Sequence, residues 1–160
     1  MFLKIFRPYI LLNLILFFSF SISVNTIIGY EDLNLLFYIF FHITFIYTLF
    51  YYYNYSIFVF GLFYGLLFDI FLLNEISVHL IIFIILILLY ILIKKYLFLI
   101  SSFQVSITIY ITLITILFFE IILSYFIANI NFNIFQMIKY IVLSTLIFIP
   151  SIYLLNKVDK

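Results

Sequence analysis

The stretch SIFVFGLFYGLLFDIFLL, residues 56–73, contains a single charged side chain, Asp69. A second apolar run, ISVHLIIFIILILLYILI at residues 76–93, follows after only Asn74 and Glu75. A helix needs about 20 mostly apolar residues to cross the hydrocarbon core of a bilayer. The two runs therefore predict two consecutive membrane-spanning helices joined by a short turn.

The composition of the whole chain agrees with this local pattern. Of its 160 residues, 69% are apolar and 8% are charged, and the mean hydropathy is +1.44. A soluble domain carries about 25% charged residues, so this chain has too few polar side chains to cover a water-exposed surface. Disorder is excluded because it requires low hydrophobicity and high charge. A net charge of +1 without a basic patch gives no nucleic-acid signal, and the lack of cysteine excludes disulfides and thiolate metal sites.

Charged and polar residues divide the rest of the sequence into similar apolar runs. We predict an all-α fold, a polytopic bundle of six transmembrane helices forming one domain over residues 1–160. The first run follows Lys4 and Arg7; it is long for a signal peptide and has no A-x-A site, so we expect a retained signal anchor. The predicted spans are residues 9–28, 33–53, 56–73, 76–93, 105–127 and 135–155.

The distribution of Lys and Arg predicts the orientation, because cytoplasmic loops of membrane proteins are enriched in both. With six spans and a cytoplasmic N-terminus, the outer loops hold Glu31, Asp32 and Glu75 but no Lys or Arg. Both termini are then predicted to be cytoplasmic. The basic residues that this topology places in the cytoplasm are Lys4, Arg7, Lys94, Lys95, Lys157 and Lys160.

Four ionisable residues fall within the outer half of the predicted spans: Asp69, His79, Glu120 and Lys139. At 1.5 Å per residue, Asp69 and Lys139 lie roughly 6 Å deep and Glu120 roughly 10 Å deep. An intramembrane charge costs roughly 2.5–3.5 kcal/mol on insertion scales, so each residue requires a partner or a route to water. One interpretation is a polar cluster between helices, in which Glu120 and Lys139 pair. The alternative is that each side chain reaches separately to the outer interface.

Gly61, Gly65 and Asp69 follow a G-x-x-x-G-x-x-x-D spacing, which places them on one face of a helix. Small residues allow another helix to approach closely, so this face either packs within the bundle or receives the helix of a partner. His42 lies in the middle of the second span, where it is either a proton relay or, as we favour, a packed histidine with one hydrogen bond. We predict no metal site, no cofactor and no catalytic residues, because the histidine spacing and enzyme motifs that these require are missing.

The segment from Gly61 to Leu89 resembles the most recognisable part of MreD, a small membrane protein of the bacterial cell-elongation machinery. That part is a G-x-x-x-G-x-x-x-D helix, a short turn and a following helix. The polar segment 31–34 and the tail, with Pro150 followed by Asn156 and Lys157, are similar to the same family. The resemblance implies the helical plan seen in the substrate-binding subunits of energy-coupling vitamin transporters.

The resemblance also implies a function. An MreD-like protein is a non-catalytic scaffold in rod-shape maintenance and peptidoglycan synthesis at the bacterial inner membrane. Its expected partner is the single-span protein MreC and, indirectly, MreB, RodA and a penicillin-binding transpeptidase, with membrane lipid around it and no nucleic acid. The alternative function is a substrate-binding subunit of an energy-coupling vitamin transporter, which requires a cavity with several convergent polar groups. An intramembrane enzyme ranks third.

Overall fold

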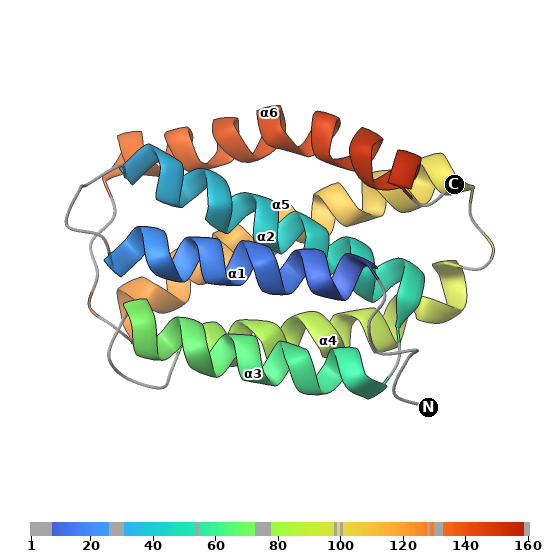
Figure 1. Ribbon diagram of the computed structural model, residues 1–160, viewed down its shortest axis with the longest axis horizontal. Helices are drawn as coiled ribbons and strands as arrows, with labels where there is room; N and C mark the ends of the chain where they lie inside the picture. Colours follow the sequence, from blue (N-terminus) through green and yellow to red (C-terminus); the bar gives the residue numbers. More distant parts are fainter. Residues whose placement is uncertain are drawn as a thin grey trace.

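In the computed structural model, the described residues form six α-helices that run back and forth along one axis of the molecule (Figure 1). The structure describes residues 8–25, 31–53, 55–72, 78–97, 99, 101–127, 129 and 133–158. The predicted all-α membrane bundle is confirmed: five of these helices are long and apolar enough to cross a membrane, and the first contains a shorter apolar segment, Ile10–Ile22. The helices are α1 (Pro8–Asn25), α2 (Glu31–Tyr52), α3 (Tyr55–Leu72), α4 (Val78–Leu97), α5 (Ser102–Phe126) and α6 (Ile134–Val158).

Two helix ends near the middle of the chain differ from the predicted spans. The sequence predicts that Lys94 and Lys95 end the fourth span, but α4 continues to Leu97 and keeps both lysines in its last turn. Positive charge is favourable there because it faces the partial negative charge of the helix C-terminus. In addition, the Lys94 ammonium lies 5.8 Å from the centre of the Tyr53 ring, a distance at which a cation is attracted to the aromatic face.

The polar segment predicted to precede the fifth span is the beginning of α5. Ser101 is its N-cap, and the Ser101 and Gln104 side chains each accept a hydrogen bond from the other residue's backbone N–H. This capping box satisfies two N–H groups that a helix N-terminus otherwise leaves without partners. α5 therefore starts at Ser102, three residues before the apolar run itself.

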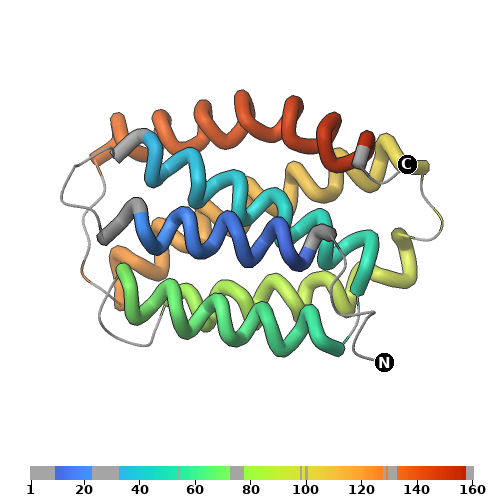
Figure 2. Tube along the Cα trace, viewed as in Figure 1, coloured from blue at the N-terminus to red at the C-terminus, as the bar shows by residue number. Residues whose placement is uncertain are grey.

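α2 is the central helix of the bundle. It packs against α1, α4, α5 and α6, and every residue from 41 to 50 is buried. α3 packs mainly against α4, so the α3–α4 hairpin lies beside α2 as a unit. α1 crosses the face of the bundle between α2 and α3 (Figures 1 and 2) and buries Phe17 and Phe20 in the core.

The core is mainly aromatic at the level of Phe68, which is fully buried. Its ring centre lies 5.2 Å from that of Phe17, 5.1 Å from Phe41 and 5.4 Å from Tyr38, in edge-to-face arrangements. Such pairs are favourable because the positive edge of one ring meets the negative face of the other. This core therefore joins α1, α2 and α3 at one level of the bundle.

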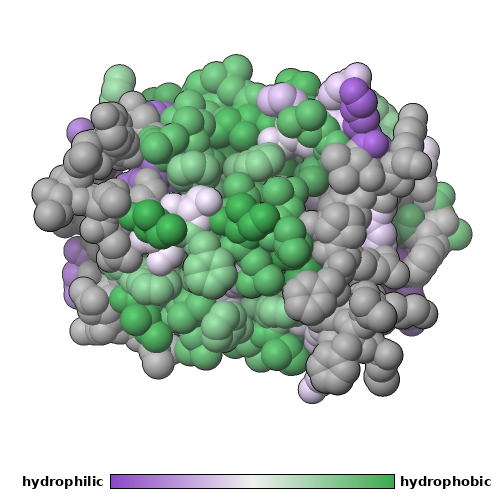
Figure 3. Space-filling model, in the orientation of Figure 1, coloured by the Kyte–Doolittle hydropathy of each residue, from purple (hydrophilic) through white to green (hydrophobic). Residues whose placement is uncertain are grey.

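On the face shown in Figure 3, the surface between the two ends of the bundle is mainly apolar. Large hydrophobic side chains are exposed on every helix, among them Phe18, Phe63, Leu92, Phe118 and Leu146. Exposed apolar area of this extent is unusual for a soluble monomer, but it is the expected boundary with lipid tails.

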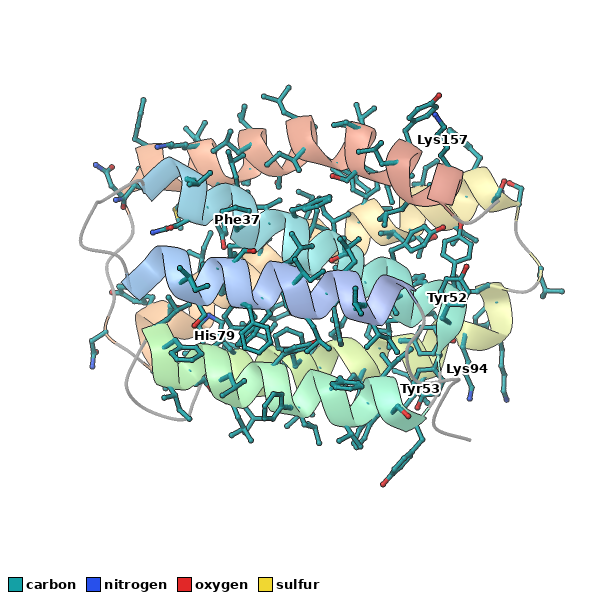
Figure 4. The ribbon with its side chains drawn as sticks, viewed as in Figure 1. Phe37, Tyr52, Tyr53, His79, Lys94 and Lys157 are labelled. Atoms are coloured by element: carbon teal, nitrogen blue, oxygen red, sulfur yellow. The ribbon has the colours of Figure 1, made fainter. Side chains whose placement is uncertain are left out.

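Charged side chains lie toward the ends of the helices. Lys94 and Lys157 lie at the same end of the bundle, together with Tyr52 and Tyr53 (Figure 4). His79 lies toward the opposite end, where α4 begins (Figure 4). The bundle therefore has a basic, tyrosine-bearing end and a second end near which the ionisable residues of the candidate site lie.

Candidate functional site

The two glycines of α3 allow α3 and α4 to approach closely. A Cβ atom added at Gly65 would lie 2.8 Å from the Leu80 Cα atom and 3.1 Å from the His79 carbonyl oxygen, which are both backbone atoms of α4. At Gly61 an added Cβ would lie 2.9 Å from the end of the Ile87 side chain. The sequence left two interpretations of the glycine face, packing within the bundle or binding a partner helix. In the structure this face packs within the bundle, against α4.

Close approach brings Asp69 to the N-terminus of α4. The Asp69 side chain is fully buried, and its two oxygens accept hydrogen bonds from the backbone N–H groups of His79, at 2.7 Å, and Leu80, at 3.0 Å. These N–H groups belong to the first turn of α4, where a helix has no internal acceptors. Asp69 therefore caps a neighbouring helix with a charge of the sign that its dipole favours.

His79 connects Asp69 to a second carboxylate. Its Nδ1 atom is 2.8 Å from Asp69 Oδ1, and its Nε2 atom is 3.7 Å from Glu120 Oε1 on α5. The first distance is that of a hydrogen bond, whereas the second is within ion-pair range but beyond a hydrogen bond. All three side chains are buried, so the structure joins Asp69, His79 and Glu120 from α3, α4 and α5.

Glu120 has a contact on α6 that the sequence analysis did not identify. The Tyr140 hydroxyl donates a long hydrogen bond of 3.5 Å to Glu120 Oε1, whereas the Lys139 side chain is exposed. Successive residues of a helix are turned by about 100° around its axis, so one position decides which side chain faces inward. Tyr140 therefore contacts Glu120 from α6, and the predicted place of Lys139 in the cluster stays a prediction.

A cavity of about 330 Å³ adjoins this cluster at the end of the bundle where α4 begins. Its walls come from α1, α2, α3, α5 and α6, and Glu120 forms part of them. Four of its seven lining residues carry a polar atom, but most of the surface that these residues expose to the cavity is apolar. The lining residues are Phe20, Asn34, Leu35, Tyr38, Leu72, Glu120 and Tyr140.

Chemically, the Asp69–His79–Glu120 arrangement holds an imidazole between two carboxylates. It can stabilise three helices through buried hydrogen bonds, and the imidazole can carry a proton between the two acids. A hydrolytic triad would place a hydroxyl or thiol nucleophile at the second imidazole nitrogen. Here that nitrogen faces Glu120, so the group is not arranged to activate a nucleophile. Among the described residues, no group of three His, Cys, Asp or Glu side chains could hold a metal ion.

A second buried polar group joins α1 to α2. The Asn13 amide donates to the Thr48 hydroxyl at 3.1 Å, and its carbonyl oxygen accepts from the Thr44 hydroxyl at 2.7 Å. His42, between this group and the carboxylates, is packed as favoured from the sequence, with Nδ1 2.9 Å from the Tyr38 carbonyl oxygen. Interhelical hydrogen bonds of this kind hold membrane helices together in a particular register.

Some of these residues escaped the sequence analysis, although the sequence carries weak signals for them. Asn13 is an amide amid apolar residues in the first span, and Thr44 and Thr48 are spaced to share a helix face. Tyr38 and Tyr140 carry no distinguishing signal among 15 tyrosines. Glu31, Asp32 and Glu75, assigned to the outer loops, lie where the structure describes no side chain.

Comparison with known proteins adds no relative: no family model, characterised protein or solved structure matches this chain.

Proposed function

We propose that this chain is a non-catalytic membrane scaffold of the MreD type, acting in the cell-elongation machinery of a bacterial inner membrane. Its direct partner in this proposal is a single-span protein like MreC. MreB, RodA and a penicillin-binding transpeptidase are indirect partners, which associate through that protein. The observation that carries the proposal is the apolar surface of the helix bundle. A molecule of this surface can recognise a partner mainly through helix packing inside the bilayer.

The glycine face does not serve as the binding surface in this proposal. Gly61 and Gly65 are buried against α4 and α2, and a partner helix could reach them only by displacing α4. A single-span partner therefore binds a lipid-facing surface instead. One concave part of that surface, about 310 Å³ in volume, lies between α5 and α6 and is lined by residues such as Ile107 and Ile149.

Co-purification combined with site-specific photo-crosslinking tests the scaffold proposal. A photo-reactive amino acid is placed at Phe63, Ile107 or Ile149, which are exposed, and at Phe83, which is fully buried, as the matched control. We expect at least one exposed position to crosslink a single-span protein with a large domain outside the membrane, and Phe83 to give none. Mass spectrometry identifies the product. The scaffold proposal would be rejected if none of the three exposed positions crosslinked such a protein and the purified complex did not contain one.

The proposed orientation places both termini in the cytoplasm. The chain has no cysteine, so single introduced cysteines can be labelled without background. Leu99, between α4 and α5, is 83% exposed at the basic end of the bundle, and Ile134, at the start of α6, is 73% exposed at the other end. We expect a membrane-impermeant maleimide to label Ile134→Cys in intact spheroplasts and Leu99→Cys only after lysis. The reverse pattern would invert the proposed topology.

A substrate-binding subunit of an energy-coupling vitamin transporter is the second candidate. The observation that favours it is the cavity beside Glu120, because a binding subunit requires a cavity with converging polar groups. The co-purification experiment separates the two candidates. A transport subunit would be recovered with a pair of ATPases and a transmembrane coupling protein, whereas the scaffold would be recovered with a single-span partner.

A further inference from the structure

We propose that the cavity bounded by Glu120, Tyr38 and Tyr140 binds an organic ammonium group. This proposal goes beyond the scaffold function, which requires no small ligand. It stands on three features of the site: a buried carboxylate oxygen without a partner, aromatic rings beside it, and a volume suited to a small amphiphilic cation.

The unpartnered atom is Glu120 Oε2. Glu120 is 91% buried, and within the described part of the chain its Oε2 atom has no hydrogen-bond partner. The other oxygen, Oε1, already receives the Tyr140 hydroxyl and lies near His79 Nε2. A buried carboxylate that lacks donors costs free energy, and a cation that approaches the Glu120 carboxylate from the adjoining cavity would lower that cost.

The aromatic rings favour an ammonium over other cations. The Tyr38 and Tyr140 rings are stacked with centres 6.3 Å apart, and Phe20 lies 5.5 Å from Tyr38. The faces of such rings attract an alkylammonium. A hydrated divalent ion would need several more oxygen ligands than one carboxylate supplies.

The remaining lining residues define the rest of the ligand. Phe20, Leu35 and Leu72 provide apolar contacts, and Asn34 contributes an amide beside the carboxylate. Leu72 is 38% exposed and so belongs to the mouth of the cavity. A volume of about 330 Å³ is at the lower end of the range for small-ligand sites. The ligand is therefore an ammonium with a short apolar body, which is either a free solute or the headgroup of an ethanolamine or choline lipid.

The test compares choline with 3,3-dimethylbutan-1-ol, which has the same shape but carries carbon in place of the charged nitrogen. The full-length protein is delipidated in an uncharged detergent, and binding of each probe is measured by calorimetry. We expect choline to bind at least about tenfold more tightly than the neutral alcohol. Equal binding of the two probes would overturn the proposal, because the charge would then play no part.

A second experiment, with lipids, distinguishes a free ammonium solute from a lipid headgroup. The delipidated protein is mixed with phosphatidylethanolamine or phosphatidylglycerol of identical acyl chains, and bound lipid is counted by native mass spectrometry. Choline binding with equal retention of both lipids indicates a free solute, whereas preferential retention of phosphatidylethanolamine, released by added choline, indicates a lipid headgroup. Either result supports an ammonium site. If neither choline nor phosphatidylethanolamine binds, the ammonium site is overturned. The scaffold proposal is unaffected by that result, because it is tested by recovery of a single-span partner.

Variants connect binding to the cavity. We expect Glu120→Gln to weaken choline binding about tenfold or more, because the amide keeps the shape and removes the charge. Tyr140→Phe keeps the aromatic face and should weaken binding only a few-fold. Thr112→Val alters a buried polar residue of α5 outside the cavity lining and should bind like the unaltered protein. Unchanged binding in Glu120→Gln would contradict the assignment, and Tyr140→Phe provides the test if Glu120→Gln does not fold.

Discussion

Asp69→Ala is expected to lower the free energy of unfolding by about 3–5 kcal/mol, the range measured when one partner of a buried charged pair is removed. The substitution leaves two N–H groups at the start of α4 and the Nδ1 atom of His79 without the acceptor that they share. The His79 donors cannot turn to water because His79 is buried, and the Leu80 N–H lies at a partly buried residue. Loss of helical circular dichroism during denaturation in mild detergent measures the effect.

Ile70→Ala is the matched control for Asp69→Ala. Ile70 is the next residue of α3 and is 48% exposed, so its truncation removes an exposed side chain at the same depth. We expect a change of about 0.5 kcal/mol, as for other surface substitutions. Asp69→Asn should lie between the two, because an amide keeps one acceptor oxygen and replaces the other with a donor. Equal stabilities of Asp69→Ala and Ile70→Ala would show that the capping contact contributes nothing.

Gly65→Ala is expected to destabilise the α3–α4 hairpin by about 1–3 kcal/mol, the usual cost of overpacking. The new Cβ atom would lie 2.8 Å from the Leu80 Cα atom, and backbone cannot move aside without shifting α4. A shift of α4 would also lengthen the hydrogen bonds between its first turn and Asp69. Gly65→Leu, with a larger side chain at the same point, should weaken folding and partner binding further.

Gly61→Ala provides the comparison within the same helix. Its added Cβ would meet the flexible end of Ile87 at 2.9 Å and the tip of Phe45 at 3.1 Å, and both are side chains that can adjust. Replacing a helical glycine with alanine also gains about 1 kcal/mol of helix propensity. We therefore expect Gly61→Ala to be close to neutral in the same unfolding measurement. If both variants were equally harmless, the helices would not meet at Gly65 as described.

The fold could be predicted from the sequence because the bilayer limits the choices. An apolar run of some 20 residues can span a membrane only as a helix, so span positions follow from the positions of charge. The helix ends were harder to predict: α4 extends past Lys94 and Lys95, and α5 begins within a segment that reads as polar. In both cases the sequence shows where an apolar run begins or ends, whereas the ends of a helix depend on capping and on the helix dipole.

The candidate site could be predicted only in part. The spacing of Gly61, Gly65 and Asp69 indicated a shared face, and depth along the helices suggested that Asp69, His79 and Glu120 could meet. The contact of Tyr140 with Glu120 depends on the rotation of α6 about its axis, which a nearly uniform apolar helix does not encode. The cavity requires contributions from five helices, and no local pattern predicts that convergence.

The contact between Asp69 and the first turn of α4 has a consequence for the insertion of the chain into the membrane. During synthesis, α3 emerges before α4, and its buried carboxylate then faces either lipid or the insertion machinery at a cost of roughly 2.5–3.5 kcal/mol. The N–H groups that remove this cost lie just ten and eleven residues further along the chain. We therefore expect α3 and α4 to enter the bilayer together as a hairpin.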